Sequence, residues 1–332
     1  MREGFAFVAF TGKGAALAER LRAELGGTVR VPGEGFSLSA WTAENFPERE
    51  ALIFIGAAGI ALRAVAPHIR SKAEDPAVLC VDETGRFVIP LLSGHLGGAN
   101  ELARLVAALT GGTAVITTAT DLNGAFAVDL WAKKQGMTVL QPERIRQVSS
   151  AVLRGKTIRI FCPYPVAGER PPQLQRVDCN AEADVLVSFR KEETGALQLI
   201  PRVLTLGVGC RRGTGADTLE RQLHLFCEER GVHPQAICRA ATIDLKQDED
   251  GLLHFCRGHG WGPVFYRAEE LRKAEGSFTA SAFVEAKTGV DNVCERAAVL
   301  CSGGGTLTES KYAAEGVTFA LAEEQPEYDW SW

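Results

Sequence analysis

Residues 4–25 read GFAFVAFTGKGAALAERLRAEL, and this stretch decides the fold class. An apolar run comes first, then a turn that contains glycine, and then Leu17, Leu21 and Leu25 at four-residue spacing. Apolar residues at this spacing lie along one face of a helix, whereas a short continuous apolar run is typical of a buried strand. The stretch therefore predicts a strand, a turn and an amphipathic helix.

The same order of elements recurs along the first part of the chain. Residues 51–67 predict a strand that enters a helix, and residues 77–92 predict two strands paired around the turn at 83–86. Residues 99–112 predict a helix that ends in glycine. The apolar face expected for that helix consists of Leu102, Leu105, Val106 and Leu109.

A further strand is expected at 113–118 and a further helix at 124–136. Strands that alternate with helices indicate a mainly parallel sheet with helices on both faces. We therefore predict an α/β fold, with an N-terminal α/β domain over residues 1–138.

The composition changes after this domain. Residues 162–175, CPYPVAGERPPQLQ, are rich in proline, and 139–201 are interpreted as a small middle segment that serves partly as a connector. Residues 202–231 begin again with a strand, a glycine-rich turn and a helix, which predicts a second α/β domain over 202–324. Residues 325–332 form an acidic, aromatic tail with no assigned role.

Length and composition limit the classes of function. The 332 residues suit about two domains, and 46% hydrophobic residues are ample for their cores. A formal net charge of −5 gives no basic field, so nucleic acid is not an expected partner. No apolar run approaches the roughly 18 residues of a membrane helix. The N-terminus also turns polar too early for a signal peptide, so we expect a cytoplasmic location without membrane association.

Nine cysteines are scattered along the chain without a CxxC pair. This number and spacing favour reduced, mostly buried thiols over disulfides or a structural zinc site. The histidines other than His95 show no ligand spacing such as HExxH, so no metal site is expected.

Three glycine-rich loops follow predicted strands, at 56–59, 93–98 and 207–215. Ligands of parallel sheets collect beyond the carboxyl ends of strands, so all three loops are candidate binding loops, and tight structural connections are the alternative. Their glycine spacings match neither the dinucleotide fingerprint nor the P-loop, so a nucleotide cofactor is not supported.

Arg211 and Arg212 stand beside the third loop, with Thr214 expected as a helix N-cap. Two guanidinium groups at such a turn suit a carboxylated or phosphorylated ligand, and a solvated surface pair is the alternative.

His95 is the titratable group of most interest. A neutral imidazole accepts a proton near pH 7, and the flanking glycines keep His95 off a helix face, although a structural histidine stays open. Ser93 lies two residues away, but the sequence lacks the G-x-S-x-G elbow, so a serine ester intermediate is a minor alternative. Other charged groups are expected at the same end of the sheet, namely the carboxylates Asp75, Asp82, Glu83 and Glu101 and the cations Arg63, Arg70 and Lys72.

Residues 54–103, FIGAAGIALRAVAPHIRSKAEDPAVLCVDETGRFVIPLLSGHLGGANELA, resemble the N-terminal domain of the CbiG family, the cobalt-precorrin-5A hydrolases of anaerobic cobalamin biosynthesis. LGVGCRRGT at 206–214, ATIDLKQDEDGLLHF at 241–255 and VTFALA at 317–322 resemble the family's C-terminal domain, which also occurs as a separate small protein. Residues 292–300, NVCERAAVL, depart from a small-residue run such as SVAEAAA and leave the fine shape of that domain open.

This resemblance implies opening of the δ-lactone of a cobalt corrinoid and loss of acetaldehyde, which gives cobalt-precorrin-5B. It implies no cofactor, because cobalt arrives with the substrate and lactone hydrolysis needs only a water, a base and a stabiliser of the oxyanion. The cations expected to meet the carboxylates of the corrinoid are Arg63, Lys72, Arg211, Arg212 and Lys311.

The residues expected to act in catalysis are His95, Ser93 and Glu101. His95 is expected to be the base or else a contact to cobalt, and the N–H groups of Gly97, Gly98 and Ala99 are expected to stabilise the oxyanion. The other candidates for substrate binding are Gly56, Gly59, Gly94, Asn100, Gly209 and Thr214.

Three alternatives stay open: a corrinoid carrier without chemistry, a tetrapyrrole methyltransferase, and a phosphate or nucleotide-sugar enzyme. Acetaldehyde formation distinguishes an enzyme from a carrier. Transient contacts with neighbouring pathway enzymes and a homodimer are open expectations about partners.

Overall fold

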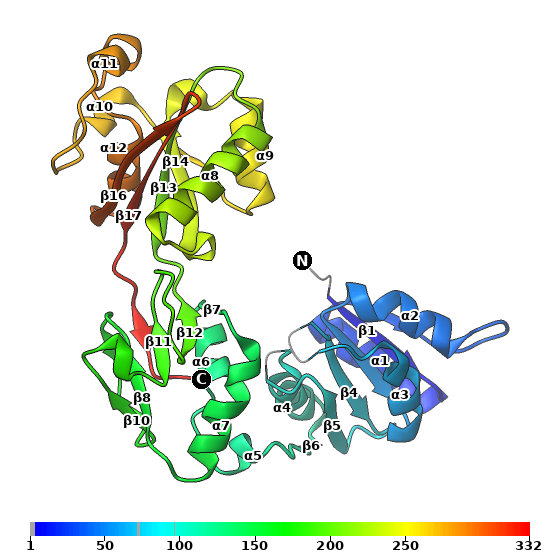
Figure 1. Ribbon diagram of the computed structural model, residues 1–332. Helices are drawn as coiled ribbons and strands as arrows, with labels where there is room; N and C mark the ends of the chain where they lie inside the picture. Colours follow the sequence, from blue (N-terminus) through cyan, green and yellow to red (C-terminus); the bar gives the residue numbers. More distant parts are fainter. Residues whose placement is uncertain (1–3, 72–73, 96) are drawn as a thin grey trace. The chain divides into compact units, whose positions relative to one another are not determined.

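The structure, a computed structural model, describes residues 4–71, 74–95 and 97–332. The chain divides into two compact units (Figure 1). The N-terminal unit runs up to Leu130 and includes Val152–Arg154, and the second unit comprises Trp131–Ala151 and Gly155–Trp332. The domain boundaries predicted at 138 and 201 stay predictions. None of the helices in the described part of the chain is long and apolar enough to cross a membrane.

A six-stranded sheet organises the N-terminal unit, in the order β2-β1-β3-β4-β5-β6. Its strands are β1 (Phe5–Ala9), β2 (Thr28–Arg30), β3 (Ala51–Ile55), β4 (Ala77–Val81), β5 (Phe87–Leu92) and β6 (Thr113–Ala114). Its helices are α1 (Gly12–Leu25), α2 (Leu38–Glu48), α3 (Ala58–Val65), α4 (Ala99–Thr110) and α5 (Ala119–Leu122), and α6 (Val128–Lys134) begins in it. The predicted strand, turn and helix of residues 4–25 are confirmed as β1 and α1, and the predicted pair of strands as β4 and β5.

Helices cover both faces of this sheet, as predicted. On one face, α1 and α4 place Leu21 and Val106 against Phe7 and Leu79 of the sheet. On the other face, α2 and α3 pack, with Phe46 of α2 in a second buried cluster. The chain therefore buries both sides of its central strands, which explains why β3 and β4 are continuous apolar runs.

Two local predictions in this unit are wrong in detail. Leu105 and Leu109 are 47% and 37% exposed, because the buried face of α4 is the row that contains Leu102 and Val106. The strand predicted at 113–118 is reduced to β6, the segment that pairs with β5.

The direction of β5 places the first two glycine loops at opposite ends of the N-terminal sheet. Strands β1, β3 and β4 are parallel, but β5 is antiparallel to β4, with Val81 opposite Val88 and Val78 opposite Leu92. Ser93, Gly94 and His95 therefore lie at the end of the sheet where β4 starts. Gly56 lies at the other end, where its N–H donates to the Val81 carbonyl.

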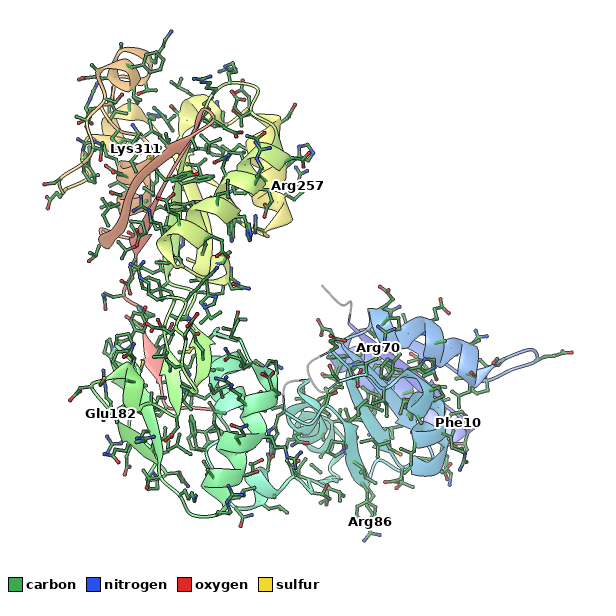
Figure 2. The ribbon with its side chains drawn as sticks, viewed as in Figure 1. Phe10, Arg70, Arg86, Glu182, Arg257 and Lys311 are labelled. Carbon is green, nitrogen blue, oxygen red and sulfur yellow. The ribbon has the colours of Figure 1, made fainter. Side chains whose placement is uncertain are left out.

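The charged residues that were expected near His95 are divided between the two ends of the sheet. Asp82 and Glu83 belong to the turn between β4 and β5, so they lie at the end of the sheet opposite to residues 93–98. Asp75 precedes β4 and accepts the Arg70 N–H at 3.0 Å. Figure 2 labels Arg86, in the same turn, at the end of this unit away from Arg70.

The middle segment has a five-stranded sheet of its own, in the order β10-β8-β11-β12-β7, so it is more than a connector. Its strands are β7 (Thr138–Val139), β8 (Ile158–Phe161), β10 (Leu174–Arg176), β11 (Val185–Val187) and β12 (Leu197–Ile200). The neighbouring short elements are α7 (Ile145–Leu153) and the 3-10 turns η2 (Pro142–Arg144) and η3 (Asn180–Glu182). All of its strand pairs are parallel except β12 with β7.

The C-terminal sheet has the order β15-β14-β13-β17-β16 and is mixed. Its strands are β13 (Leu204–Cys210), β14 (Ile237–Ile243), β15 (Val264–Tyr266), β16 (Thr306–Ala314) and β17 (Val317–Glu323). Its helices are α8 (Ala216–Arg230), α9 (Asp250–Gly258), α10 (Ala268–Leu271), α11 (Ala282–Thr288) and α12 (Cys294–Cys301). Helix α12 packs directly on β13, since a Cβ at Gly207 would lie 1.7 Å from the Cys294 carbonyl oxygen.

The aromatic tail, which the sequence left unassigned, packs against α6 and pairs with β9 in a two-stranded sheet of its own. Strand β18 (Tyr328–Asp329) pairs in parallel with β9 (Val166–Ala167). Trp330 stacks on Trp131 with ring centroids 5.3 Å apart, and the Trp131 Nε1–H donates to the Asp329 carbonyl at 2.7 Å. The segment after β17 therefore joins the C-terminal sheet to β9 and Trp131 within the second unit.

Candidate functional site

His95 is held between two carboxylates in the N-terminal unit. Its Nε2 lies 2.9 Å from Asp121 Oδ2, and its Nδ1 lies 3.3 Å from Asp129 Oδ2. Thr120 Oγ1 lies 3.1 Å from Nε2 as well. The side chains of His95, Asp121 and Asp129 are only 16%, 10% and 7% exposed, so this cluster, named the His95 cluster here, is largely shielded from water.

Helix α4 and the following segment hold Asp121 in place. Asn100 Nδ2 donates to Asp121 Oδ2 and to Thr118 Oγ1, both at 3.0 Å. Arg104, one turn further along α4, pairs with Asp121 Oδ1 at 2.5 Å. Because residues four apart in a helix lie on one face, α4 presents both partners to the same carboxylate.

The two carboxylates change the protonation of the imidazole. The hydrogen bond to Asp129, with the charge of Asp129 and the contact to Asp121, raises the pKa of His95 above its ordinary value, although burial acts in the opposite direction. Burial acts to raise the pKa of Asp121, but Arg104 and His95 together hold it below its usual value. The cluster therefore favours an imidazolium between two carboxylates over a free base.

Ser93 adopts an unusual conformation beside this cluster. Its φ of 57° lies in the left-handed region, where non-glycine residues are strained. Ser93 as a whole is 8% exposed, and its Oγ is buried without a hydrogen-bond partner among the described residues. Asp129 Oδ1 is a second buried oxygen without a hydrogen-bond partner among the described residues. Unpaired buried polar atoms cost about 1–3 kcal/mol each, so an unpaired oxygen on Asp129 and one on Ser93, two residues before His95, make this region a candidate functional site.

The glycines of the loop allow this conformation. A Cβ at Gly97 would lie 2.3 Å from the Ser93 Cβ, and a Cβ at Gly94 would lie 2.8 Å from Asn100 Oδ1. The glycines thus make room for the strained serine and for the side chain that supports Asp121.

The expected backbone donors are mostly occupied. The Gly98 N–H donates to the His95 carbonyl at 2.8 Å, and the Ala99 N–H donates to the Ser93 carbonyl at 3.1 Å. Two of the three N–H groups predicted to stabilise an oxyanion are therefore used to close the loop, which leaves Gly97 as the candidate from this set.

The other predicted residues of this unit do not join the cluster. Glu101 is exposed on α4 and forms no hydrogen bond or ion pair with the described residues of the His95 cluster. Gly59 and Arg63 belong to α3, which follows Gly56 and the carboxyl end of β3. Lys72 lies outside the described residues.

The third glycine loop, predicted at 207–215, is reduced to 211–215, because Gly207 and Gly209 belong to β13, and carboxylates from the segment before α9 satisfy its polar groups. Glu249 Oε2 accepts the Gly213 N–H at 2.8 Å, and Lys246 Nζ lies 3.1 Å from Oε1 of the same carboxylate. Arg212 faces Asp248 at 3.4 Å and Glu249 at 3.6 Å. The charge of Arg212 is thus already opposed by two carboxylates.

The other predicted residues of the C-terminal loop have local partners. Thr214 is not the N-cap of α8, because Gly215 occupies that position and the Thr214 hydroxyl donates to the Arg211 carbonyl at 2.8 Å. The Arg211 N–H donates to the Gly316 carbonyl at 3.0 Å, and its side chain is exposed. A Cβ at Gly209 would lie 2.4 Å from Thr318 Oγ1, so Gly209 is required for strand packing.

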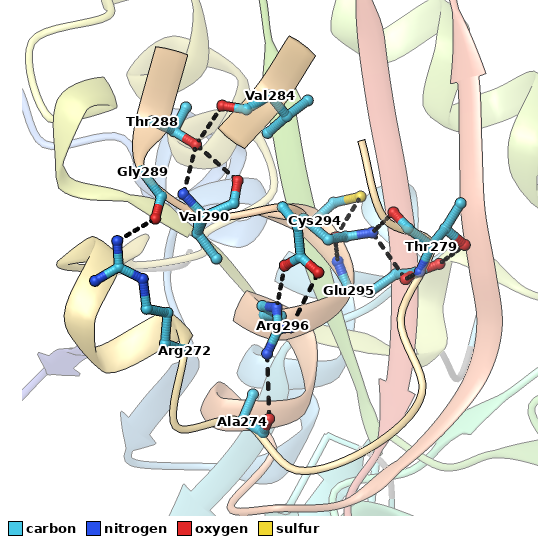
Figure 3. Close-up of polar contacts among 12 residues, drawn as sticks. Arg272, Ala274, Thr279, Val284, Thr288, Gly289, Val290, Cys294, Glu295 and Arg296 are labelled. Carbon is cyan, nitrogen blue, oxygen red and sulfur yellow. Dashed lines mark hydrogen bonds and ion pairs between the residues drawn. The ribbon is translucent and has the colours of Figure 1, made fainter. Parts of the chain in front are cut away.

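Lys311 is tied by its backbone to a buried carboxylate. Glu295, which is fully buried, accepts the Lys311 N–H at 2.7 Å and the Thr279 N–H and Oγ1–H at 2.6 and 2.9 Å. Asn292 Nδ2 donates to Glu295 as well, at 2.8 Å. Figure 3 shows Thr279 and Glu295 in this network beside the start of α12. With these partners Glu295 joins α12 to β16 as a structural carboxylate.

Sequence reasoning missed Thr120, Asp121 and Asp129, which complete the His95 cluster. They follow β6, in the run TTATDLNGAFAVDL at 117–130. Two aspartates within nine residues of this run were the signal that the sequence offered. Within the described ranges, no group of three His, Cys, Asp or Glu side chains is arranged to hold a metal ion.

Three family models match most of this chain. They are described as cobalamin synthesis G N-terminal, cobalamin biosynthesis central region and cobalamin synthesis G C-terminus, and they match residues 40–121, 126–201 and 204–322.

Two relatives and one solved structure are similar to this protein over most of the chain. A cobalt-precorrin-5A hydrolase from Priestia megaterium is 34% identical over 83% of this chain and 79% of its own length. A cobalt-precorrin-5A hydrolase from Salmonella typhimurium is 34% identical over 96% of this chain and 97% of its own length. The solved structure of a cobalamin biosynthesis protein G homolog from Sulfolobus solfataricus is 20% identical over 96% of this chain and 97% of that chain, with a TM-score of 0.41.

Proposed function

Because the chain belongs to the CbiG family, we propose that it hydrolyses the δ-lactone of cobalt-precorrin-5A and releases acetaldehyde, which gives cobalt-precorrin-5B in anaerobic cobalamin biosynthesis. Two relatives named cobalt-precorrin-5A hydrolase, each 34% identical over most of the chain, support an enzyme over a carrier. The observation that carries the choice of site is the His95 cluster, with its buried imidazole between two carboxylates.

The raised pKa of His95 changes the role that suits it. An imidazolium with both nitrogens bonded to carboxylates cannot take a proton from water, and neither nitrogen offers a lone pair to cobalt. The positive charge suits stabilisation of the oxyanion and protonation of the leaving oxygen. We therefore assign His95 as the acid of lactone opening and set aside its expected role as the base.

Asp129 is the base in this proposal. Its Oδ2 faces His95, and its buried Oδ1 has no partner among the described residues. A water gives its proton to Oδ1, and its oxygen bonds to the lactone carbonyl carbon. The ring C–O bond then breaks, and the alkoxide takes a proton from the imidazolium. The proton on Asp129 returns to His95, so the pair ends in its starting state.

Ser93 is the donor that completes the site. Its hydroxyl is free to donate to the carbonyl oxygen as negative charge develops there. Ser93 Oγ and Asp129 Oδ1 are both buried, so the glycine-containing loop has to shift when the substrate enters. Acetaldehyde loss follows lactone opening, and no residue is assigned to that step.

The decisive experiment incubates the purified chain with cobalt-precorrin-5A and measures lactone opening and acetaldehyde together. We expect both products with wild-type protein and neither with Asp129→Asn. Glu101→Gln is the matched control, since Glu101 is an exposed carboxylate of the same unit. Tight binding of the corrinoid without acetaldehyde would instead identify a carrier.

A corrinoid substrate and a cytoplasmic location belong to the same proposal. The nine cysteines are all free thiols, which supports a reducing compartment. The His95 cluster is proposed as the place where the lactone of the substrate binds. Contacts with other enzymes of the pathway and a homodimer stay predictions.

A further inference from the structure

The middle sheet contains a groove that the proposed reaction does not use. Its volume is about 630 Å³, and its walls come from α7, the start of β8, the segment before β11 and the loop between β11 and β12. The polar side chains along it include Arg144, Gln147, Lys156, Thr157, Arg159 and Thr194. A volume of this size falls within the range of about 300–1,000 Å³ that holds small molecules.

Arg144 is fixed in this groove without losing its charge. Its Nη1 donates to the carbonyls of Thr194 at 3.0 Å and of Ala196 at 2.6 Å. These acceptors are neutral, and Arg144 forms no ion pair with any described residue. The guanidinium is therefore held rigidly while its remaining N–H groups are available to a ligand.

The other charges leave the groove positive. Arg159 is paired with Asp184, at 2.9 Å between Nη2 and Oδ1, so the two charges cancel. Lys156 is exposed and has no carboxylate partner in the described part of the chain. Arg144 and Lys156 are therefore two cations without a counter-charge on the walls of one groove.

The backbone around the groove offers few free donors. The Ile158 N–H donates to the Gln173 carbonyl, and the Leu197 N–H donates to the Asp184 carbonyl. The Ala196 N–H donates to Thr194 Oγ1 at 3.3 Å. A ligand would therefore be recognised by the cationic side chains, which favours an anion with separated charges over one compact anion in a nest of N–H groups.

We infer that this groove binds the carboxylate side chains at the rim of the corrinoid substrate and so forms a second substrate-binding surface, outside the His95 cluster. The inference rests on the proposed function for the identity of the ligand. A corrinoid with several acetate and propionate groups supplies separated charges, and Arg144 suits two-point contact with one carboxylate while Lys156 meets another. The groove contributes to binding without taking part in the reaction, so its loss should raise KM and leave kcat unchanged.

The test uses two corrinoids with the same ring. Dicyanocobyrinic acid has free carboxylates around the ring, and dicyanocobinamide has amides in their place. We expect the full-length protein to bind the acid and to bind the amide at least tenfold more weakly.

Lys156→Ala should weaken binding of the acid by about two- to fivefold, the effect of one exposed charge pair, and Lys156→Glu should weaken it further. Arg146→Ala is the control, because Arg146 is exposed on α7, which forms one wall of the groove, but its side chain does not line the groove. Unlike Arg144, Lys156 holds no loop, so its variants should fold normally.

Three outcomes would overturn the inference: equal binding of the acid and the amide, equal effects of Lys156→Ala and Arg146→Ala, or displacement of the acid by inorganic phosphate but not by chloride at the same ionic strength. Acetaldehyde assays on the same proteins separate the two claims. Lys156-dependent binding without acetaldehyde supports the groove and contradicts the proposed function. Normal turnover by Lys156→Glu with an unchanged KM supports the proposed function and contradicts the groove.

Discussion

Two glycine-rich loops of this protein look alike in sequence and differ in how their polar groups are satisfied. Each follows a strand and precedes a helix, and each was expected to bind the substrate. The loop at 211–215 is closed, since Glu249 takes the Gly213 N–H and opposes Arg212. The loop at 93–98 leaves its own Ser93 Oγ buried and unpaired, and Asp129 of α6, the partner of His95, has an unpaired buried Oδ1 as well. Satisfied polar groups indicate a structural turn, and unsatisfied ones indicate a place prepared for chemistry.

The largest difference between the loops should appear in turnover. His95→Asn and Asp129→Asn should each lower kcat for lactone opening by about 100- to 10,000-fold, the usual contribution of general acid or base catalysis. Stopped assays of acetaldehyde with folded variants measure this effect. A loss of less than tenfold in both variants would remove the His95 cluster from the mechanism.

The next effect is on stability. Gly97→Ala should destabilise the protein by about 2–3 kcal/mol, because its new Cβ would overlap the Ser93 Cβ, 2.3 Å away. Gly12→Ala is the control in the same unit, since no heavy atom lies within 4 Å of that Cβ position. Urea unfolding of both variants tests the comparison, and equal midpoints would show that the loop relaxes without strain.

The His95 cluster should also make stability depend on pH. A group whose pKa is raised in the folded state stabilises that state fully below its unfolded pKa, which is 6.5 for histidine, and loses the effect as the pH rises through the folded value. The stability advantage of wild type over His95→Asn should therefore be largest at about pH 6 and shrink by about pH 9. Thermal unfolding at both pH values measures it, and an advantage that grows with pH would mean a neutral imidazole.

Ser93→Gly separates strain from function. Glycine adopts a φ of 57° without penalty, so stability should stay level or rise by up to about 1 kcal/mol. Turnover should nevertheless fall, because the hydroxyl is gone, and Ser93→Ala should be as slow while keeping the strain. A Ser93→Gly variant with wild-type kcat would reduce Ser93 to a structural residue.

The smallest effect is expected in the closed loop. Arg212→Ala should change KM by less than about threefold, because Asp248 and Glu249 already oppose the charge and the side chain is exposed. Steady-state kinetics at low ionic strength test this. A rise in KM of tenfold or more would mean that Arg212 exchanges its carboxylate partners for those of the substrate, as the sequence suggested.

The amino-acid sequence by itself determined the alternation of strands and helices, the hairpin of β4 and β5, the loop around His95 and the family. These follow from short-range patterns, since periodicity and glycine placement act within a few residues. Only the tertiary structure decided that β5 lies between β4 and β6 in the sheet, with Gly56 and Ser93 at opposite ends. It also brought Asp121 and Asp129 to an imidazole 26 and 34 residues earlier in the chain. Contacts over such distances depend on how α4, α5 and α6 pack, and no local pattern in the sequence encodes that packing.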